Sequence, residues 1–208
     1  MWRLSEARGD LSARRATRIL NALGSLEFSV NKIMLEKPAI LVLTGASGAG
    51  KTTLALKLGQ LTIAGVVSIN CDRVKIEFPE SGDPSDYQAA ILKYWISQVR
   101  DDKGQVELAV LDTQIRPHRA REALSLAMVA YSEIVLVDCD PVRRNARLRG
   151  ERGQPELANA QMDCWAAYLR GQADAMGLPI IDTSEDPEEK SLEILVDLVR
   201  NLRDRAAA

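Results

Sequence analysis

The stretch that decides the fold runs from Ala39 to Thr53 and reads AILVLTGASGAGKTT. Its first half is an apolar run typical of a buried strand, and residues 45–52 match the pattern G-x-x-x-x-G-K-[ST]. Glycines let such a loop curl until successive backbone N–H groups point inward, and the amino terminus of the helix that follows adds partial positive charge. The stretch therefore predicts a strand, an anion-binding loop and a helix that begins at Lys51.

The residues of this loop suit the phosphates of a nucleoside triphosphate. We expect Lys51 to reach the β- and γ-phosphates and the Thr52 hydroxyl to help hold Mg²⁺, so ATP and Mg²⁺ are the predicted ligands. A glycine turn without a ligand is the alternative interpretation. The predicted nucleotide-binding residues of the loop are Gly45, Ala46, Ser47, Gly48, Ala49, Gly50, Lys51, Thr52 and Thr53.

Beyond Pro38, short apolar runs alternate with longer helical patterns, as is typical of a parallel sheet with helices on both faces. We predict an α/β, three-layer P-loop NTPase fold with five parallel strands. The strands are expected at Ala39–Thr44, Val66–Asn70, Val106–Leu111, Ile134–Val137 and Pro179–Ile181. The helices are expected at Lys51–Leu61, Ser85–Val99, Pro117–Ala130, Pro141–Arg149, Pro155–Met176 and Pro187–Arg205. Asp140 and Asp186 each precede a proline and are expected to cap a helix.

Charge divides the chain into two parts. Residues 1–37 carry seven Lys/Arg against four Asp/Glu, whereas the rest carries 20 against 25. We predict a basic helical extension over residues 1–37 and the loop-bearing domain over residues 38–208. The acidic body makes nucleic acid a possible but not a favoured partner. No apolar run approaches the roughly 18 residues of a membrane span, and three widely spaced cysteines favour reduced thiols and a cytoplasmic location.

The sequence also narrows the kind of loop protein. It contains neither an Asn-Lys-x-Asp guanine-reading motif nor a Leu-Ser-Gly-Gly-Gln transporter signature, and it is short for an AAA+ machine. A compact phosphotransferase remains. The layout of residues 38–205 resembles the nucleoside monophosphate kinase superfamily, especially the branch of gluconate kinases, polynucleotide kinases and zeta-type toxins.

Two strand-end aspartates add to this resemblance. Residues 69–75, INCDRVK, resemble a polynucleotide kinase motif in which an Asp is followed three positions later by Arg, here replaced by Lys75. The resemblance implies that Asp72 accepts the proton of the acceptor hydroxyl. Residues 110–116, VLDTQIR, look like a Walker B strand, which implies Mg²⁺ binding by Asp112. For both aspartates the alternative is a cap.

Arginines provide the rest of the predicted acceptor site. The Asp-x-x-x-Arg spacing from Asp112 to Arg116 is similar to adenylate kinases, whose Arg grips the acceptor phosphate, although their Gly-x-Pro is absent here. Residues 140–153, DPVRRNARLRGERG, resemble the arginine-rich lid of these kinases. A lid of this kind brings guanidinium groups onto the transferring phosphoryl group. Among its five arginines we predict catalytic roles for Arg147 and Arg152, the alternative being a solvated basic face.

Weaker signals come from the end of the chain and from the aromatic residues. Residues 181–187, IDTSEDP, look like the strand-five loop that cups adenine in this branch, which implicates Thr183. The helical spacing of four aromatic residues favours the core over base stacking. His118 is expected in the first turn of a helix. The four aromatic residues are Tyr94, Trp95, Trp165 and Tyr168.

Together these patterns predict a kinase that transfers the γ-phosphate of Mg²⁺-ATP to a small acceptor, such as a nucleotide, a nucleoside or a sugar-like molecule. Lys51, Asp72, Arg116, Arg147 and Arg152 are the candidate catalytic residues. One alternative is a polynucleotide 5′-hydroxyl kinase or a toxin-like sugar nucleotide kinase, and another is a nucleotide-binding regulator without an acceptor. The sequence leaves a monomer and a homodimer equally open.

Overall fold

The central strand of the fold is β1 (Ala39–Thr44), which is buried along its whole length. The computed structural model describes residues 38–73, 84–101, 106–185 and 188–208. Within these residues the sheet has five strands in the order β2-β3-β1-β4-β5, and every neighbouring pair is parallel. The other strands are β2 (Val66–Asn70), β3 (Leu108–Asp112), β4 (Ser132–Asp138) and β5 (Ile180–Asp182). Their carboxyl ends therefore meet at one edge.

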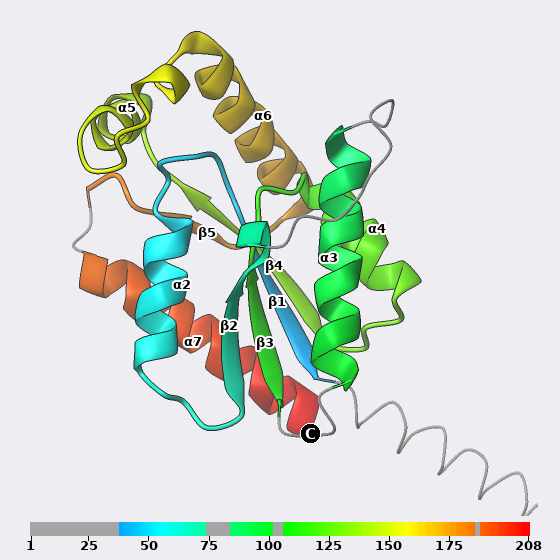
Figure 1. Cartoon of the computed structure of the whole chain (residues 1–208). Helices are drawn as coiled ribbons and strands as arrows, with labels where there is room; N and C mark the ends of the chain where they lie inside the picture. The colour runs from blue at the N-terminus through cyan, green and yellow to red at the C-terminus, as the bar shows by residue number, and fades with distance from the viewer. Residues whose placement is uncertain (1–37, 74–83, 102–105, 186–187) are drawn as a thin grey trace, which may run out of the picture. The chain divides into compact units, whose positions relative to one another are not determined.

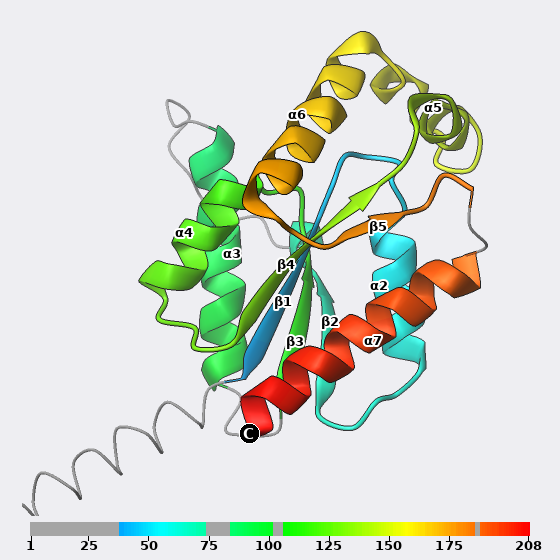
Figure 2. The same ribbon diagram turned by 180° about the vertical axis from the view of Figure 1, so that it is seen from behind.

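Helices cover both faces of the sheet (Figures 1 and 2). Leu41 and Leu43 of β1 pack in one core with α2 (Lys51–Gln60) and α7 (Glu188–Ala207). The alternate residues Ile40 and Val42 pack in a second core with α3 (Pro84–Asp101) and α4 (Pro117–Leu126). Burial on both faces explains why β1 is a continuous apolar run. The predicted three-layer α/β fold is confirmed.

Two further helices lie over the carboxyl edge of the sheet (Figure 1). They are α5 (Pro141–Arg149) and α6 (Ala160–Met176), and between them comes the short turn η2 (Pro155–Leu157). Leu169 and Ala173 of α6 pack against Leu136 of β4. Helix α5 stands beside the loop that follows β1, with Arg144 and Leu148 next to Gly48, whereas α6 packs against β4 and α4.

Most predicted elements are present, with shifted boundaries. The predicted helix Pro155–Met176 is divided, because the Asn159 side chain accepts a hydrogen bond from the Met162 N–H at 2.9 Å and starts α6 afresh. The Asp140 cap is confirmed, since Oδ1 accepts from the Arg143 N–H at 3.0 Å. The strand predicted from Val106 begins at Leu108 and includes Asp112.

Several predictions lie outside the described residues, namely the helical extension over residues 1–37, Lys75 and the cap at Asp186. The chain divides into two units, Met1–Glu36 and Lys37–Ala208. No described helix is both long and apolar enough to cross a bilayer.

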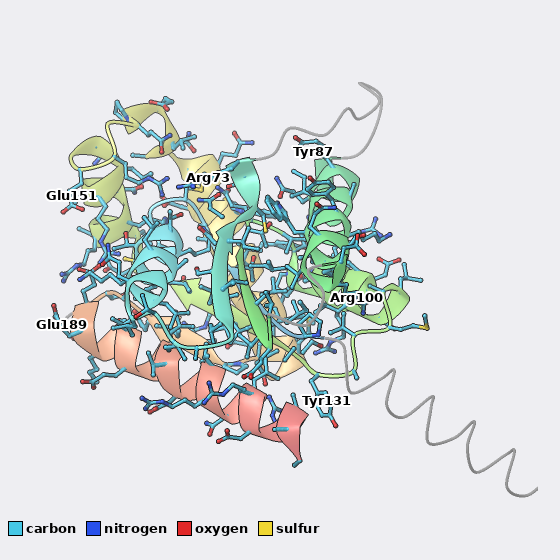
Figure 3. The ribbon with its side chains drawn as sticks, turned by 60° about the horizontal axis from the view of Figure 1, so that its bottom comes forward. Arg73, Tyr87, Arg100, Tyr131, Glu151 and Glu189 are labelled. Carbon is cyan, nitrogen blue, oxygen red and sulfur yellow. The ribbon has the colours of Figure 1, made fainter. Side chains whose placement is uncertain are left out.

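Figure 3 identifies the two ends of the sheet. The labelled Tyr131 precedes β4 at the amino end, whereas the labelled Arg73 closes η1 (Cys71–Arg73), which follows β2 at the carboxyl end. In parallel α/β sheets, ligands bind outside the carboxyl ends of the strands. The glycine-rich loop and both predicted aspartates lie at that end.

Candidate nucleotide-binding site

The glycine-rich loop has a backbone that side chains would not allow. Gly45 has φ +150°, and a Cβ placed on it would lie 2.2 Å from the carbonyl oxygen of Val137. Gly50, with φ +98°, is the N-cap of α2. These positions explain why the sequence places glycines there, because L-residues rarely adopt such angles. The loop can therefore bring backbone N–H groups close to a phosphate.

Lys51 lies at the centre of the loop and is only 5% exposed. Its Nζ donates hydrogen bonds to the carbonyl oxygens of Gly45 at 2.8 Å and Ala46 at 3.1 Å. Burial lowers the pKa of Lys51 to about 8, although the nearby carboxylates of Asp112 and Asp72 oppose the shift. A buried ammonium gains from an anion, so the surroundings of Lys51 suit a phosphate chain.

Thr52 and Asp112 form the oxygen-rich side of the site. The Thr52 hydroxyl donates to Asp112 Oδ2 at 2.7 Å. Burial raises the pKa of Asp112, partly offset by Lys51 and by this hydrogen bond. Among the described residues, no group of three or more His, Cys, Asp or Glu side chains gathers to hold a metal. Mg²⁺ is usually bound through one or two carboxylates together with substrate phosphates, and the Thr52–Asp112 pair fits that arrangement.

Asp72 follows β2 and lies at the same edge. Its backbone N–H donates to Asn70 Oδ1 at 3.0 Å, while Asn70 Nδ2 lies 3.4 Å from Asp112 Oδ2. Burial of the carboxyl group raises the pKa of Asp72, and Lys51 and Arg152 partly oppose that rise. Arg152 lies close enough to influence the pKa values of Lys51, Asp72 and Asp112, so all four charged groups belong to one site.

The arginines of the predicted lid divide into two groups. Arg144 is 1% exposed, and its guanidinium donates to the Cys139 carbonyl oxygen at 3.1 Å and pairs with Asp163. Arg147 is half-buried and donates to Thr183 Oγ1 and to the Thr183 carbonyl oxygen, both at 2.9 Å. The remaining three are exposed, namely Arg143, Arg149 and Arg152. One α5 face therefore anchors the helix, and the other arginines stay accessible.

Thr183 connects β5 to the loop. It is 6% exposed, and its Oγ1 lies within hydrogen-bonding distance of the Ala49 carbonyl oxygen at 2.9 Å and the Asp138 carbonyl oxygen at 3.1 Å. Arg147 also approaches the Gly48 carbonyl oxygen, at 3.5 Å. Thr183 and Arg147 therefore hold the glycine-rich loop through its Ala49 and Gly48 carbonyl oxygens. Adenine contact by Thr183 stays a prediction. Thr53 is exposed in the first turn of α2.

Comparison with known proteins agrees with this geometry. The model of the zeta toxin family matches residues 27–115, which contain the loop, Asp72 and Asp112. The crystal structure of APE1195 is 20% identical, with 81% of this chain and 98% of that chain covered and a TM-score of 0.54. A gluconokinase from Sinorhizobium meliloti 1021 is 15% identical, with 81% and 98% covered and a TM-score of 0.50. The chain has a P-loop kinase fold. No curated protein matches the sequence significantly.

Arg116 extends the candidate site towards α6. Its backbone is extended at the N-cap of α4, and its Cζ lies 5.7 Å from the Trp165 ring centroid and 5.8 Å from the Tyr168 centroid. These three residues line a cavity of about 510 Å³. The prediction that Tyr168 belongs to the core is wrong, because its face of α6 meets Arg116 while Leu169 and Ala173 turn inward. Tyr94 is likewise exposed.

The other two predicted core aromatics are half-buried. Trp95 packs against the core between the sheet and α3, and its Nε1 donates to the Cys71 carbonyl oxygen at 3.3 Å. Trp165 packs against the small core beneath α6. His118 lies in the first turn of α4, as predicted, and is exposed. Its ring contacts the Gln172 side chain.

Three residues in and around the candidate site were not predicted from the sequence. Asn70 pairs in register with Asp112 on the neighbouring strand, so alignment of the two strands would have suggested it. Arg144 lies four positions before buried Leu148, a spacing that places both on one face of a helix. Gln114 accepts a hydrogen bond from Ser47 Oγ at 3.4 Å, and no sequence signal suggests that contact.

Proposed function

We propose that the protein is an ATP-dependent kinase that transfers the γ-phosphate to a hydroxyl group of a small-molecule acceptor. The observation that carries the proposal is the convergence of Lys51, the Thr52–Asp112 pair and Asp72 at one edge of the sheet. A P-loop kinase fold supports the proposal without naming the acceptor.

Each group of the site has a separate proposed role in binding ATP or in transferring its γ-phosphate. Loop N–H groups bind the phosphate oxygens, and Lys51 adds a positive charge that is strong because the surroundings are dry. Mg²⁺ at Thr52 and Asp112 would neutralise charge on the β- and γ-phosphates. Asp72 accepts the proton of the attacking hydroxyl, a role that is favoured because burial raises the pKa of its carboxyl group.

Two arginines are proposed to act on the acceptor and the transferring group. Arg152 is exposed and lies close enough to Asp72 to influence the pKa of the Asp72 carboxyl group. The Arg152 guanidinium can therefore approach the phosphoryl group during its transfer. Arg116 follows Asp112 on the same segment and is proposed to orient the acceptor. Arg147 is proposed to act through the loop, because its guanidinium is held by Thr183.

The first experiment incubates the protein with γ-labelled ATP, Mg²⁺ and separate pools of nucleotides, nucleosides, sugars, sugar nucleotides and 5′-hydroxyl oligonucleotides. We expect label in one small-molecule pool. Lys51→Ala should reduce transfer by about 10²–10³-fold. Lys57→Ala is the matched control, because Lys57 lies on the same helix and pairs with Glu188 at the surface. Release of free phosphate alone, with every pool unlabelled, would contradict the proposal.

The role of Asp72 has its own test. Asp72→Asn should lower transfer by about 10²–10⁴-fold while leaving ATP affinity nearly intact, because the amide cannot take up the hydroxyl proton. ATP affinity is measured by calorimetry on the same protein. Weakened ATP binding would instead place Asp72 with Asp112 in metal binding.

The match to the zeta toxin family model favours a second candidate, a sugar nucleotide kinase. The sugar nucleotide pool tests it directly, because labelling confined to that pool would select this acceptor. Labelling of oligonucleotides that falls steeply as salt rises would instead indicate a polynucleotide acceptor.

A further inference from the structure

We infer that the cavity between Arg116 and α6 binds the acceptor and selects a ring compound that carries an anionic group. The inference rests on the proposed kinase function and adds the chemical class of the acceptor. It is based on the charge of the cavity lining, the N–H donors of the Arg116 guanidinium and the stacked rings of Trp165 and Tyr168.

The lining of the cavity favours an anion with an apolar face. Arg116 is the only charged side chain among the described residues that line it, and no carboxylate opposes it. Asn159 and Gln161 supply amide groups, and Trp165 and Tyr168 supply aromatic surface. The volume of about 510 Å³ is within the range of roughly 300–1,000 Å³ usual for small-molecule sites.

Arg116 presents unused hydrogen-bond donors to this cavity. The guanidinium lies near two ring faces, which are 5.7 and 5.8 Å away at their centroids. Within the described part of the chain, no carboxylate pairs with it. A guanidinium held against a ring keeps its in-plane N–H groups free, and these match the two oxygens of a carboxylate or phosphate.

Trp165 and Tyr168 form an aromatic surface on which the ring of an acceptor could stack. Trp165 and Tyr168 stack with an interplanar angle of 21° and a centroid distance of 5.6 Å. Gln172 Nε2 donates to the Tyr168 hydroxyl at 2.7 Å and also contacts His118, so the tyrosine ring is held from α4. Tyr168 is nevertheless 43% exposed. An exposed, immobilised ring suits the face of a base or a sugar.

The cavity is tied to the P-loop by the segment from Asp112 to Arg116. Four residues span at most about 14 Å. Thr113 Oγ1 lies 3.3 Å from Gln88 Oε1, and Ser47 Oγ lies 3.4 Å from Gln114 Oε1. The Thr44 hydroxyl also donates to the Ile115 carbonyl oxygen. Arg116 is therefore held in place beside the phosphate loop, where an acceptor has to lie.

The test is calorimetric titration of the full chain, with its loop filled by Mg²⁺ and a non-hydrolysable ATP analogue. The probes are uridine monophosphate, glucose 6-phosphate and glucuronate, with uridine, glucose and inorganic phosphate for comparison. At least one anionic ring compound should bind about tenfold more tightly than its neutral counterpart and than inorganic phosphate. The nucleotide, sugar phosphate and sugar acid arms identify the source of the ring and of the anion.

Matched variants separate the two parts of the site. Arg116→Gln should weaken the anionic probe about 10–100-fold and leave its neutral counterpart unchanged, with Arg119→Gln on the same helix as control. Tyr168→Leu should weaken both probes about tenfold. Tyr94→Leu is its control, because Tyr94 is similarly exposed at 39% but lies on α3. Thermal melting of each variant checks that it is folded.

Two outcomes would overturn the inference: no anionic ring probe binds more tightly than inorganic phosphate, or Arg116→Gln and Tyr168→Leu bind like their controls. Labelled transfer to an acceptor whose KM is unchanged in both variants would also refute it, while the kinase function stands. Variant-sensitive binding without any transfer would support the site and contradict the kinase function.

Discussion

The glycine-rich loop and helix α5 lie against each other, but they place charge by different means. The loop uses its backbone, whose shape depends on glycines that have no room for a Cβ. Helix α5 uses side chains, and Arg144 anchors the helix while Arg152, just beyond it, faces the charged site. In the loop, stability and ligand binding should therefore change together. On α5 and the turn after it, a substitution should change either stability or the reaction, depending on which arginine is replaced.

The largest effect is expected in the loop. Gly45→Ala would place a Cβ 2.2 Å from the Val137 carbonyl oxygen at φ +150°, so the loop or β4 must move. We expect a loss of about 5 kcal/mol or more in the free energy of unfolding, together with loss of ATP binding. Urea denaturation and calorimetry measure the two effects.

Gly171→Ala is the matched control for that variant. Gly171 lies inside α6, and a Cβ there would meet no heavy atom within 4 Å. This variant should gain about 0.4–1 kcal/mol, because alanine loses less conformational entropy on folding. If Gly45→Ala is as stable as Gly171→Ala and binds ATP, the loop is not held as described.

The next effect is on α5. Arg144→Ala removes a buried guanidinium that pairs with Asp163, together with the side-chain stem that packs beneath Gly48, and it should cost about 3 kcal/mol through lost packing and hydrogen bonds. Arg143→Ala, one residue earlier but exposed, should change stability by less than about 0.5 kcal/mol. Urea denaturation of both variants checks the difference. Equal losses would show that Arg144 is not an anchor.

The sequence was sufficient to predict the strand, loop and helix around the glycines, but not to tell which arginines of α5 have buried partners. From Ala39 to Lys51 the signals are local, because strand burial, glycine spacing and helix start all lie within one short stretch. The roles of Arg144 and Arg147 depend on Asp163 and Thr183, which are 19 and 36 residues further along the chain. No local pattern indicates such partners.

The aromatic residues of α6 teach the same lesson. Helical spacing places Trp165 and Tyr168 near one another on α6. The same spacing is found whether that face of the helix packs against the sheet or lines a cavity. Leu169 and Ala173 occupy the inward positions, and only the packed structure shows that Arg116 lies over the aromatic pair. Asp72 and Asp112 were predicted from short local motifs, because residues 69–75 resemble a polynucleotide kinase motif and residues 110–116 resemble a Walker B strand. In the structure Asp72 lies two residues after β2, and Asp112 ends β3.

A third effect concerns the pH dependence of the loop. The pKa of Lys51 is about 8 in the folded protein and 10.5 in its ordinary state. Between these values the unfolded chain binds a proton that the folded chain does not, so the free energy of unfolding rises with pH across that window. The stability difference between wild type and Lys51→Met should change by about 3 kcal/mol from pH 8 to pH 10.5.

Urea denaturation of the nucleotide-free proteins at several pH values makes this comparison, and titrating groups remote from the loop cancel between the two proteins. ATP affinity of the wild type should also fall as pH rises above about 8, because the neutral amine no longer attracts phosphate. Parallel stability curves for the two proteins would mean that Lys51 is not desolvated in the empty loop.

The smallest effect separates two arginines that the sequence grouped together. Arg152→Ala should reduce the maximal rate of transfer by about 10–100-fold with unchanged stability, because Arg152 is exposed and lies near the charged centre. Arg147→Ala should cost about 1–3 kcal/mol in stability, because Thr183 loses two hydrogen bonds beside the loop. Any effect of Arg147→Ala on rate would follow from a displaced loop and should be accompanied by weaker ATP binding. Steady-state kinetics, ATP titration and urea denaturation on both variants decide between them. If Arg147→Ala lowers the rate with stability and ATP affinity intact, Arg147 touches the reacting groups after all, and helix α5 contributes to catalysis through its buried face as well.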